Sequence, residues 1–164
     1  MIQESVIVRR DIFRKYPKRY EGILTQIFKN IEIITESEAK AAMIWIIGEY
    51  CKIIENAGVL LMKYLESFHE ESEQVQLSIL SAVIRLYLVS PNMGGRLCQV
   101  LFNNIITSCE NPDIRDRGYI YWRLVTKNPK LASKLLTAQK PKINDLSYTF
   151  ESSLLEKYLS VLMS

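Results

Sequence analysis

The side chains best suited to catalysis or metal binding are few and scattered. The single histidine is His69, and the three cysteines are Cys51, Cys98 and Cys109. Metal sites and activated nucleophiles need several such groups at characteristic spacings, and no metal-binding spacing or nucleophile motif surrounds these four. We therefore predict no enzyme activity, no cofactor and no metal site. His69 is interpreted as a cation at a helix end, and the cysteines as small core residues in a reducing compartment.

A basic run near the N-terminus is the first candidate for binding. Its six cations are opposed by Glu4 and Asp11: Arg9, Arg10, Arg14, Lys15, Lys18 and Arg19. Such a run attracts acidic lipid headgroups, at about 1 kcal/mol per residue near an anionic bilayer. Helical geometry does not place all six on one side, so a solvated helix face is the favoured reading and a phosphoinositide-facing patch the alternative. A net charge of only +3 argues against nucleic acid as a partner.

The segment 113–124 is the most unusual local pattern. Asp113 and Arg117 are four residues apart, in the acid-before-base order that stabilises a helix by roughly 0.3 kcal/mol. Gly118 in mid-helix costs about 1 kcal/mol relative to alanine, so we expect another helix to approach closely there. We favour core packing and an ion-pair ladder between repeats over a ligand site, with these members: Asp113, Arg115, Asp116, Arg117, Gly118, Tyr119, Tyr121, Trp122 and Arg123.

Three prolines divide the chain into helical units. Pro17, Pro91 and Pro129 each end one run of apolar residues spaced by three or four and open the next. Their separations, 91 − 17 = 74 and 129 − 91 = 38, correspond to two repeats and one repeat of about 37 residues, the period of stacked helical hairpins. The predicted fold class is therefore all-α, an α-solenoid of HEAT/armadillo-like helical hairpins.

The same patterns predict the boundaries of one solenoid fragment, residues 1–164, which we expect to be a piece of a longer stack. Hairpins are predicted over about 4–31, 36–69, 72–109 and 112–138, and a terminal amphipathic helix over about 151–163. Its apolar stripe comprises Leu154, Leu155, Tyr158, Leu159 and Leu162.

Local signals predict how several helices start. A hydroxyl within Thr35-Glu36-Ser37-Glu38 is expected to cap a helix over about 38–54. Asn111-Pro112 and Asn128-Pro129 each pair a capping side chain with proline at the first helical position. Gly94-Gly95 lacks the lysine of a phosphate-binding loop, and we expect Met93-Gly94-Gly95 to form a turn.

Composition places the chain among ordinary globular proteins. It is 48% apolar and 24% charged, which argues against disorder. No apolar stretch approaches the roughly 20 residues of a membrane-spanning helix, and no signal-peptide pattern opens the chain. We expect a soluble, cytoplasmic protein.

Four ordered stretches resemble the trunk of the β-adaptins, the β subunits of heterotetrameric clathrin adaptor complexes. They are DIFRKYP (11–17), AAMIWIIGEY (41–50), FHEESEQVQL (68–77) and NPDIRDRGYIYWRL (111–124). The resemblance covers about residues 4–142 and is loose after Lys142. It implies that this chain is the C-terminal part of the trunk.

By that resemblance the intact subunit is an α-solenoid that clasps a medium subunit and packs against a second large subunit. The complex links cargo to clathrin in vesicle-mediated intracellular protein transport, peripherally on the cytosolic face of Golgi, endosomal or plasma membranes, including endocytic coated pits. Arf-type GTPases and phosphoinositides control the family. Clathrin is contacted through a hinge and an appendage that this chain lacks, so the resemblance assigns no clathrin or cargo residue here.

Two other functions remain open from the residues alone. One is a coatomer-type, nuclear-transport or other HEAT/armadillo scaffold. The other is a solenoid regulatory subunit that binds a small GTPase, because solenoid surfaces serve many partners.

Overall fold

The computed structural model describes residues 2–16, 19, 22, 24 and 33–138, and these residues form seven helices and no strand. The predicted all-α class is confirmed for this part of the chain. The helices are α1 (Ile2–Lys15), α3 (Ser37–Glu49), α4 (Ala57–Glu66), α5 (Glu73–Val89), α6 (Pro91–Ser108), α7 (Pro112–Lys127) and α8 (Pro129–Leu136).

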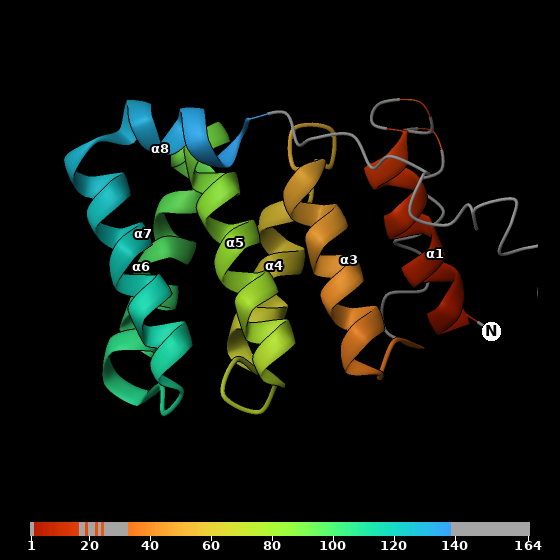
Figure 1. The fold of residues 1–164 in the computed structure, drawn as a ribbon, viewed down its shortest axis with the longest axis horizontal. Helices are drawn as coiled ribbons and strands as arrows, with labels where there is room; N and C mark the ends of the chain where they lie inside the picture. The colour runs from red at the N-terminus through yellow and green to blue at the C-terminus, as the bar shows by residue number, and fades with distance from the viewer. Residues whose placement is uncertain (1, 17–18, 20–21, 23, 25–32, 139–164) are drawn as a thin grey trace, which may run out of the picture.

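The helices stand side by side in chain order, from α1 at one end to α7 at the other (Figure 1). One layer is a series in which α1 contacts α3, α3 contacts α5 and α5 contacts α7. A second layer is formed by α4 and α6, which contact each other and pack behind α5. Each helix therefore buries its apolar stripe against sequence-near neighbours, which is the packing of an α-solenoid.

The centre of the stack is the most deeply buried part. Helix α3 has neighbours on several sides, and residues on nearly all of its faces are buried, among them Met43, Ile44, Ile46 and Ile47 at 0% exposure. Full burial of each such side chain contributes about 1.5–3 kcal/mol relative to exposure. This explains why the sequence of α3 has no polar face.

Glycines let two pairs of helices approach closely. A Cβ at Gly48 of α3 would lie 2.8 Å from the Cα of Ala82 in α5, and a Cβ at Gly94 would lie 2.4 Å from the Cα of Tyr87. The expected turn at Met93-Gly94-Gly95 is wrong, because α6 begins at Pro91 and these residues lie within its first turns. Only Ser90 separates α5 from α6, and Gly94 lets the new helix pass against the backbone of the old one.

The asparagine caps are confirmed. The side chain of Asn111 accepts hydrogen bonds from the backbone N–H groups of Asp113 and Ile114, and Asn128 accepts one from Leu131. Each side chain thereby satisfies N–H groups that a helix start leaves without a partner.

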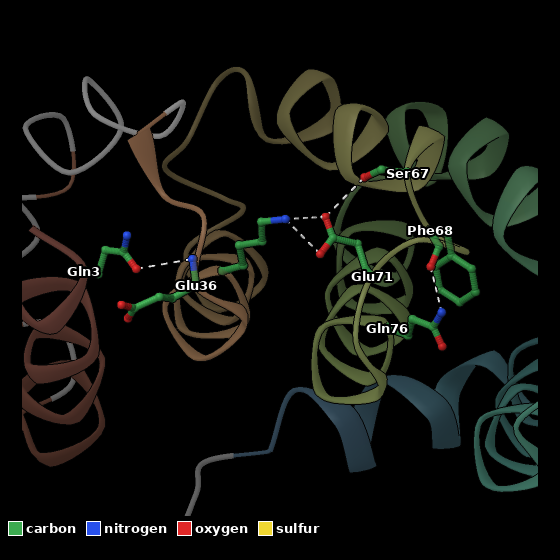
Figure 2. Close-up of polar contacts among 7 residues, drawn as sticks. Gln3, Glu36, Ser67, Phe68, Glu71 and Gln76 are labelled. Atoms are coloured by element: carbon green, nitrogen blue, oxygen red, sulfur yellow. Dashed lines mark hydrogen bonds and ion pairs between the residues drawn. The ribbon is translucent and has the colours of Figure 1, made fainter.

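The predicted hydroxyl cap of α3 is wrong. The N-cap residue is Glu36, with no hydrogen bond from its side chain, and its backbone N–H donates to Oε1 of Gln3 in α1 at 3.2 Å (Figure 2). Thr35 Oγ1 instead accepts a hydrogen bond from Gln3 Nε2. Helix α3 is also shorter than expected and ends at Glu49, since turns over residues 51–56 redirect the chain into α4.

Helix α8 departs from the upright arrangement. It lies along one edge of the stack, near the ends of α7, α6 and α5 (Figure 1), and packs against α7 and α5. The division of the chain into four hairpins stays a prediction. Most of the second helix expected within 4–31, and all of the terminal helix expected over 151–163, lie outside the described residues.

Candidate interaction surfaces

The described members of the N-terminal basic run differ in how far they are exposed. Arg9 and Arg10 are half-buried, and Arg14, Lys15 and Arg19 are exposed. Arg10 Nε lies 3.0 Å from the Asp11 carboxylate, which offsets one of the charges. Lys18 lies outside the described residues. The exposed cations therefore gather at the C-terminal end of α1, where positive charge is also favoured by the helix dipole.

An apolar stripe runs along the outer side of α1. Val8, Ile12 and Tyr16 are spaced by four residues and are 55%, 40% and 40% exposed. The Tyr16 ring lies 5.6 Å from the Lys15 ammonium and 5.9 Å from the Arg19 guanidinium. This combination of apolar and cationic groups is suited to packing against another helical surface.

Helix α7 packs against α6 at Gly118. A Cβ at this position would lie 2.7 Å from Cγ2 of Ile105, so the glycine permits the contact. Asp113 and Arg117 form an ion pair at 3.1 Å within the helix, and both side chains are more than half exposed. Exposed pairs of this kind contribute about 0–1 kcal/mol, so this one does not hold α7 in place.

The interpretation as core packing is wrong for Tyr119 and Trp122, which are 40% and 43% exposed. Arg115, Asp116 and Arg123 are exposed as well, whereas Tyr121 is half-buried. The reason is position, because α7 is the last helix of its layer in the described part of the chain, and no described helix covers its outward face. The spacing of apolar residues in the sequence identifies an apolar face of a helix, but it does not show whether another helix packs against that face.

Polar links that the sequence did not predict join successive helices near Glu71, and the ion-pair ladder expected over 113–123 stays a prediction. Lys40 of α3 donates to both carboxylate oxygens of Glu71, at 2.7 and 2.9 Å, and Ser67 donates to the same carboxylate at 3.3 Å (Figure 2). Gln76 of α5 donates to the backbone oxygen of Phe68 at 2.7 Å. These contacts tie α3 and the end of α4 to the start of α5. Lys40 and Glu71 are 31 residues apart, so no local sequence signal could have paired them.

Arg85 of α5 is the second polar junction that the sequence did not reveal. Its guanidinium donates to the Glu49 carboxylate at the end of α3, and to the backbone oxygen of Leu136 through Nε at 3.1 Å and Nη2 at 2.8 Å. The side chain is only 15% exposed. Arg85 therefore joins α3, α5 and the C-terminal end of α8, whose terminal carbonyls favour a cation.

A groove of about 320 Å³ lies beside this junction, between α3, α5, α7 and α8. Its lining is mostly apolar and consists of Trp45, Gly48, Ser81, Ala82, Arg85, Tyr121, Leu135 and Leu136.

Burial raises the pKa of the Cys51 thiol and changes the acidity of two further groups in the described core. It raises the pKa of the Cys98 thiol to about 12. Burial, with a smaller effect of the Glu71 carboxylate, raises the pKa of Tyr64 to about 12. Both groups are therefore protonated and unreactive at neutral pH.

The described residues contain no cluster of three or more histidine, cysteine or acidic side chains that could hold a metal ion. His69 is exposed, and its ring packs edge-on against Phe68 with centroids 5.5 Å apart. Among the described helices, none combines the length and apolarity that crossing a bilayer requires.

Comparison with known proteins connects this helical stack to one family. A family profile described as "Adaptin N terminal region" matches residues 2–129. The chain is 43% identical over 159 residues to the AP-1 complex subunit beta-1 of Mus musculus and, with the same coverage, to the AP-1 complex subunit beta of Dictyostelium discoideum; in each case the match covers 97% of this chain and 17% of the relative.

A more distant relative is the AP-2 complex subunit beta of Schizosaccharomyces pombe, 40% identical over 144 residues, which are 88% of this chain and 21% of that protein. The chain thus spans about a fifth or less of the length of these relatives.

Proposed function

The chain belongs to the adaptin family, and from this premise we propose that it is a structural segment of a β-type subunit in a clathrin-associated adaptor complex. The observation that carries the proposal is the adaptin match over residues 2–129, most of the described stack. The family relation favours this role over a coatomer-type or other HEAT/armadillo scaffold. The role is the provision of subunit–subunit contacts in vesicle-mediated intracellular transport, without catalysis.

The proposed partners are the medium subunit and the second large subunit of the complex. Support comes from exposed apolar and aromatic groups at the two ends of the stack, on α1 and α7, since tyrosine, tryptophan and arginine dominate binding energy at protein interfaces. The test is co-expression of the full chain with each partner and copurification. We expect at least one partner to copurify and the yield to fall with Trp122→Asp, while Lys127→Asp, an exposed change on the same helix, leaves it unchanged. Failure of the folded chain to retain either partner would contradict the proposal.

We place this segment in the C-terminal part of the adaptin trunk. The support is the resemblance of residues 111–124 and 41–50 to that region. A parent reading frame in which most trunk repeats follow this segment would contradict the placement.

Membrane attachment on the cytosolic face is the second part of the proposal. The exposed Arg14, Lys15 and Arg19, together with Lys18, would bind phosphoinositide headgroups weakly and in a salt-dependent manner. The measurement is co-sedimentation with vesicles that contain phosphoinositide. Charge reversal at these four positions should abolish binding, and equal binding after reversal would remove this part of the proposal.

Regulation by an Arf-type GTPase and contact with clathrin would belong to the whole subunit. We assign no described residue to either. Nucleotide-dependent binding of a small GTPase to this chain alone would instead favour a regulatory role.

A further inference from the structure

The groove beside Arg85 is an apolar surface without a described cover. Trp45 and Tyr121 are half-buried on its sides, and Leu135 of α8 is 58% exposed at its rim. Among the described lining residues, Arg85 is the one charged group, and it is already engaged by the Glu49 carboxylate and the Leu136 carbonyl. The groove therefore offers an occupant apolar contact rather than an ion pair.

The chain itself leaves the described structure at this groove. Helix α8 runs from the end of α7 back toward α5, so the direction of the stack is reversed. Arg85 holds the carbonyl of Leu136, and Ala138 is the last described residue. The last described residue is thus two positions beyond Leu136 of the groove lining.

These remaining residues have the pattern that the groove can accept. In a helix over 151–163, the side chains Leu154, Leu155, Tyr158, Leu159 and Leu162 fall on one stripe, and Glu156 and Lys157 fall away from it. We infer that this C-terminal segment packs its leucine and tyrosine stripe into the groove between α3, α5, α7 and α8 of its own chain.

The dimensions allow this arrangement. Residues 139–150 can span up to about 40 Å when extended, which gives the segment ample reach from Ala138. A helix of the predicted length is about 20 Å long. Helices α3, α5 and α7 contact one another in series, and three helices at the usual interaxial spacing of about 8–10 Å present a surface of about the same width.

Occupation by the chain itself has a consequence for assembly. The C-terminal segment then fills the apolar groove, so that the groove is not available to another subunit. The outer faces of α1 and α7 remain for contacts with other subunits. It also gives Arg85 a positioning role, since Arg85 fixes the point from which the segment departs.

The test uses the full chain with a photo-crosslinking benzoylphenylalanine in place of Leu135, and a matched control with the same group in place of Ile106, which is 50% exposed on α6. Mass spectrometry then identifies the crosslinked peptides. We expect the probe at 135 to crosslink to residues 151–163 within one chain, at a yield that does not change over a hundredfold range of protein concentration, and the probe at 106 to give no such product.

Two further variants separate docking from chance proximity. Leu155→Asp combined with Leu159→Asp should abolish the crosslink, whereas Lys157→Asp, off the stripe, should retain it. No intramolecular product with 151–163, or a product between chains that rises with concentration, would overturn the inference. Circular dichroism of each variant checks that the helical stack is unchanged.

Discussion

Gly48 sets how closely α3 and α5 approach each other. A methyl group at this position would meet the backbone of Ala82 at 2.8 Å, and backbone cannot move aside as the end of a side chain can. Gly95, in α6, has no atom within 4 Å of the corresponding position. The two glycines therefore differ in what an alanine would do, although both lie in helices.

Gly48→Ala should lower the free energy of unfolding by about 1–3 kcal/mol, because the added methyl group forces the two helices apart. Gly95→Ala should raise it by about 0.5–1 kcal/mol, because alanine is the better helix former and meets no obstacle. Denaturant titration of both variants and of the wild type measures the two changes in the free energy of unfolding. Equal effects of the two substitutions would contradict the close packing of α3 on α5.

Buried acidic groups, among them Cys98 and Tyr64, give the stability of the stack a dependence on alkaline pH. The pKa values of Cys98 and Tyr64 are raised to about 12, above their ordinary values of 9.0 and 10.0. The folded state holds these protons more tightly, so their contribution is complete below about pH 9 and is lost as the pH rises to about 12. The free energy of unfolding should therefore fall over this range.

Cys98→Ala should make the loss in the free energy of unfolding smaller from about pH 9 upward. Tyr64→Phe should make it smaller between about pH 10 and 12. Urea titrations at a series of pH values measure both slopes. If each variant keeps the wild-type slope, the two groups are not buried as described.

At the scale of the element, the C-terminal end of α8 is bound by the Arg85 side chain, in addition to the packing of α8 on α5 and α7. The Arg85 guanidinium reaches the Leu136 carbonyl and the Glu49 carboxylate together, so its loss removes the ion pair with Glu49 and both hydrogen bonds that the Leu136 carbonyl accepts from it. An unpaired, partly buried acceptor costs about 1–3 kcal/mol.

Arg85→Ala should therefore speed amide hydrogen exchange in residues 129–136 and lower the free energy of unfolding by about 1–3 kcal/mol. Arg96→Ala removes an exposed arginine of α6 and should change both by little. Exchange in α8 that is the same for the two variants would show that Arg85 does not hold this helix.

The caps of the helices show which elements the sequence could predict. Asn111 and Asn128 cap α7 and α8 through contacts within three residues, so the local pattern was sufficient. The cap of α3 comes from Gln3, 33 residues before Glu36, and follows only from the packing of α1 on α3. Thr35 and Ser37 offered hydroxyl groups beside Glu36, but the backbone N–H of Glu36 donates to Gln3 instead.

For the whole molecule too, local patterns in the sequence predicted some features, and others depended on tertiary packing. Apolar periodicity and proline spacing were enough to predict a helical stack, because each hairpin can bury its stripe only against its neighbours. The outward faces of Tyr119 and Trp122 could not be predicted, because a stripe with a neighbour and a stripe without one have the same spacing. The Lys40–Glu71 and Arg85–Glu49 links needed the three-dimensional register of the stack.

The most direct measurement of the central claim, that this stack joins adaptor subunits, is a chimera of the 43% identical AP-1 complex subunit beta-1 of Mus musculus in which this chain replaces the matching segment. Copurification of the other subunits of that complex is the readout, with Gly48→Ala and Trp122→Asp as paired variants. We predict that the chimera assembles, that Gly48→Ala weakens assembly in proportion to its loss of stability, and that Trp122→Asp weakens it without such a loss. A folded, soluble chimera that retains no other subunit would contradict the account.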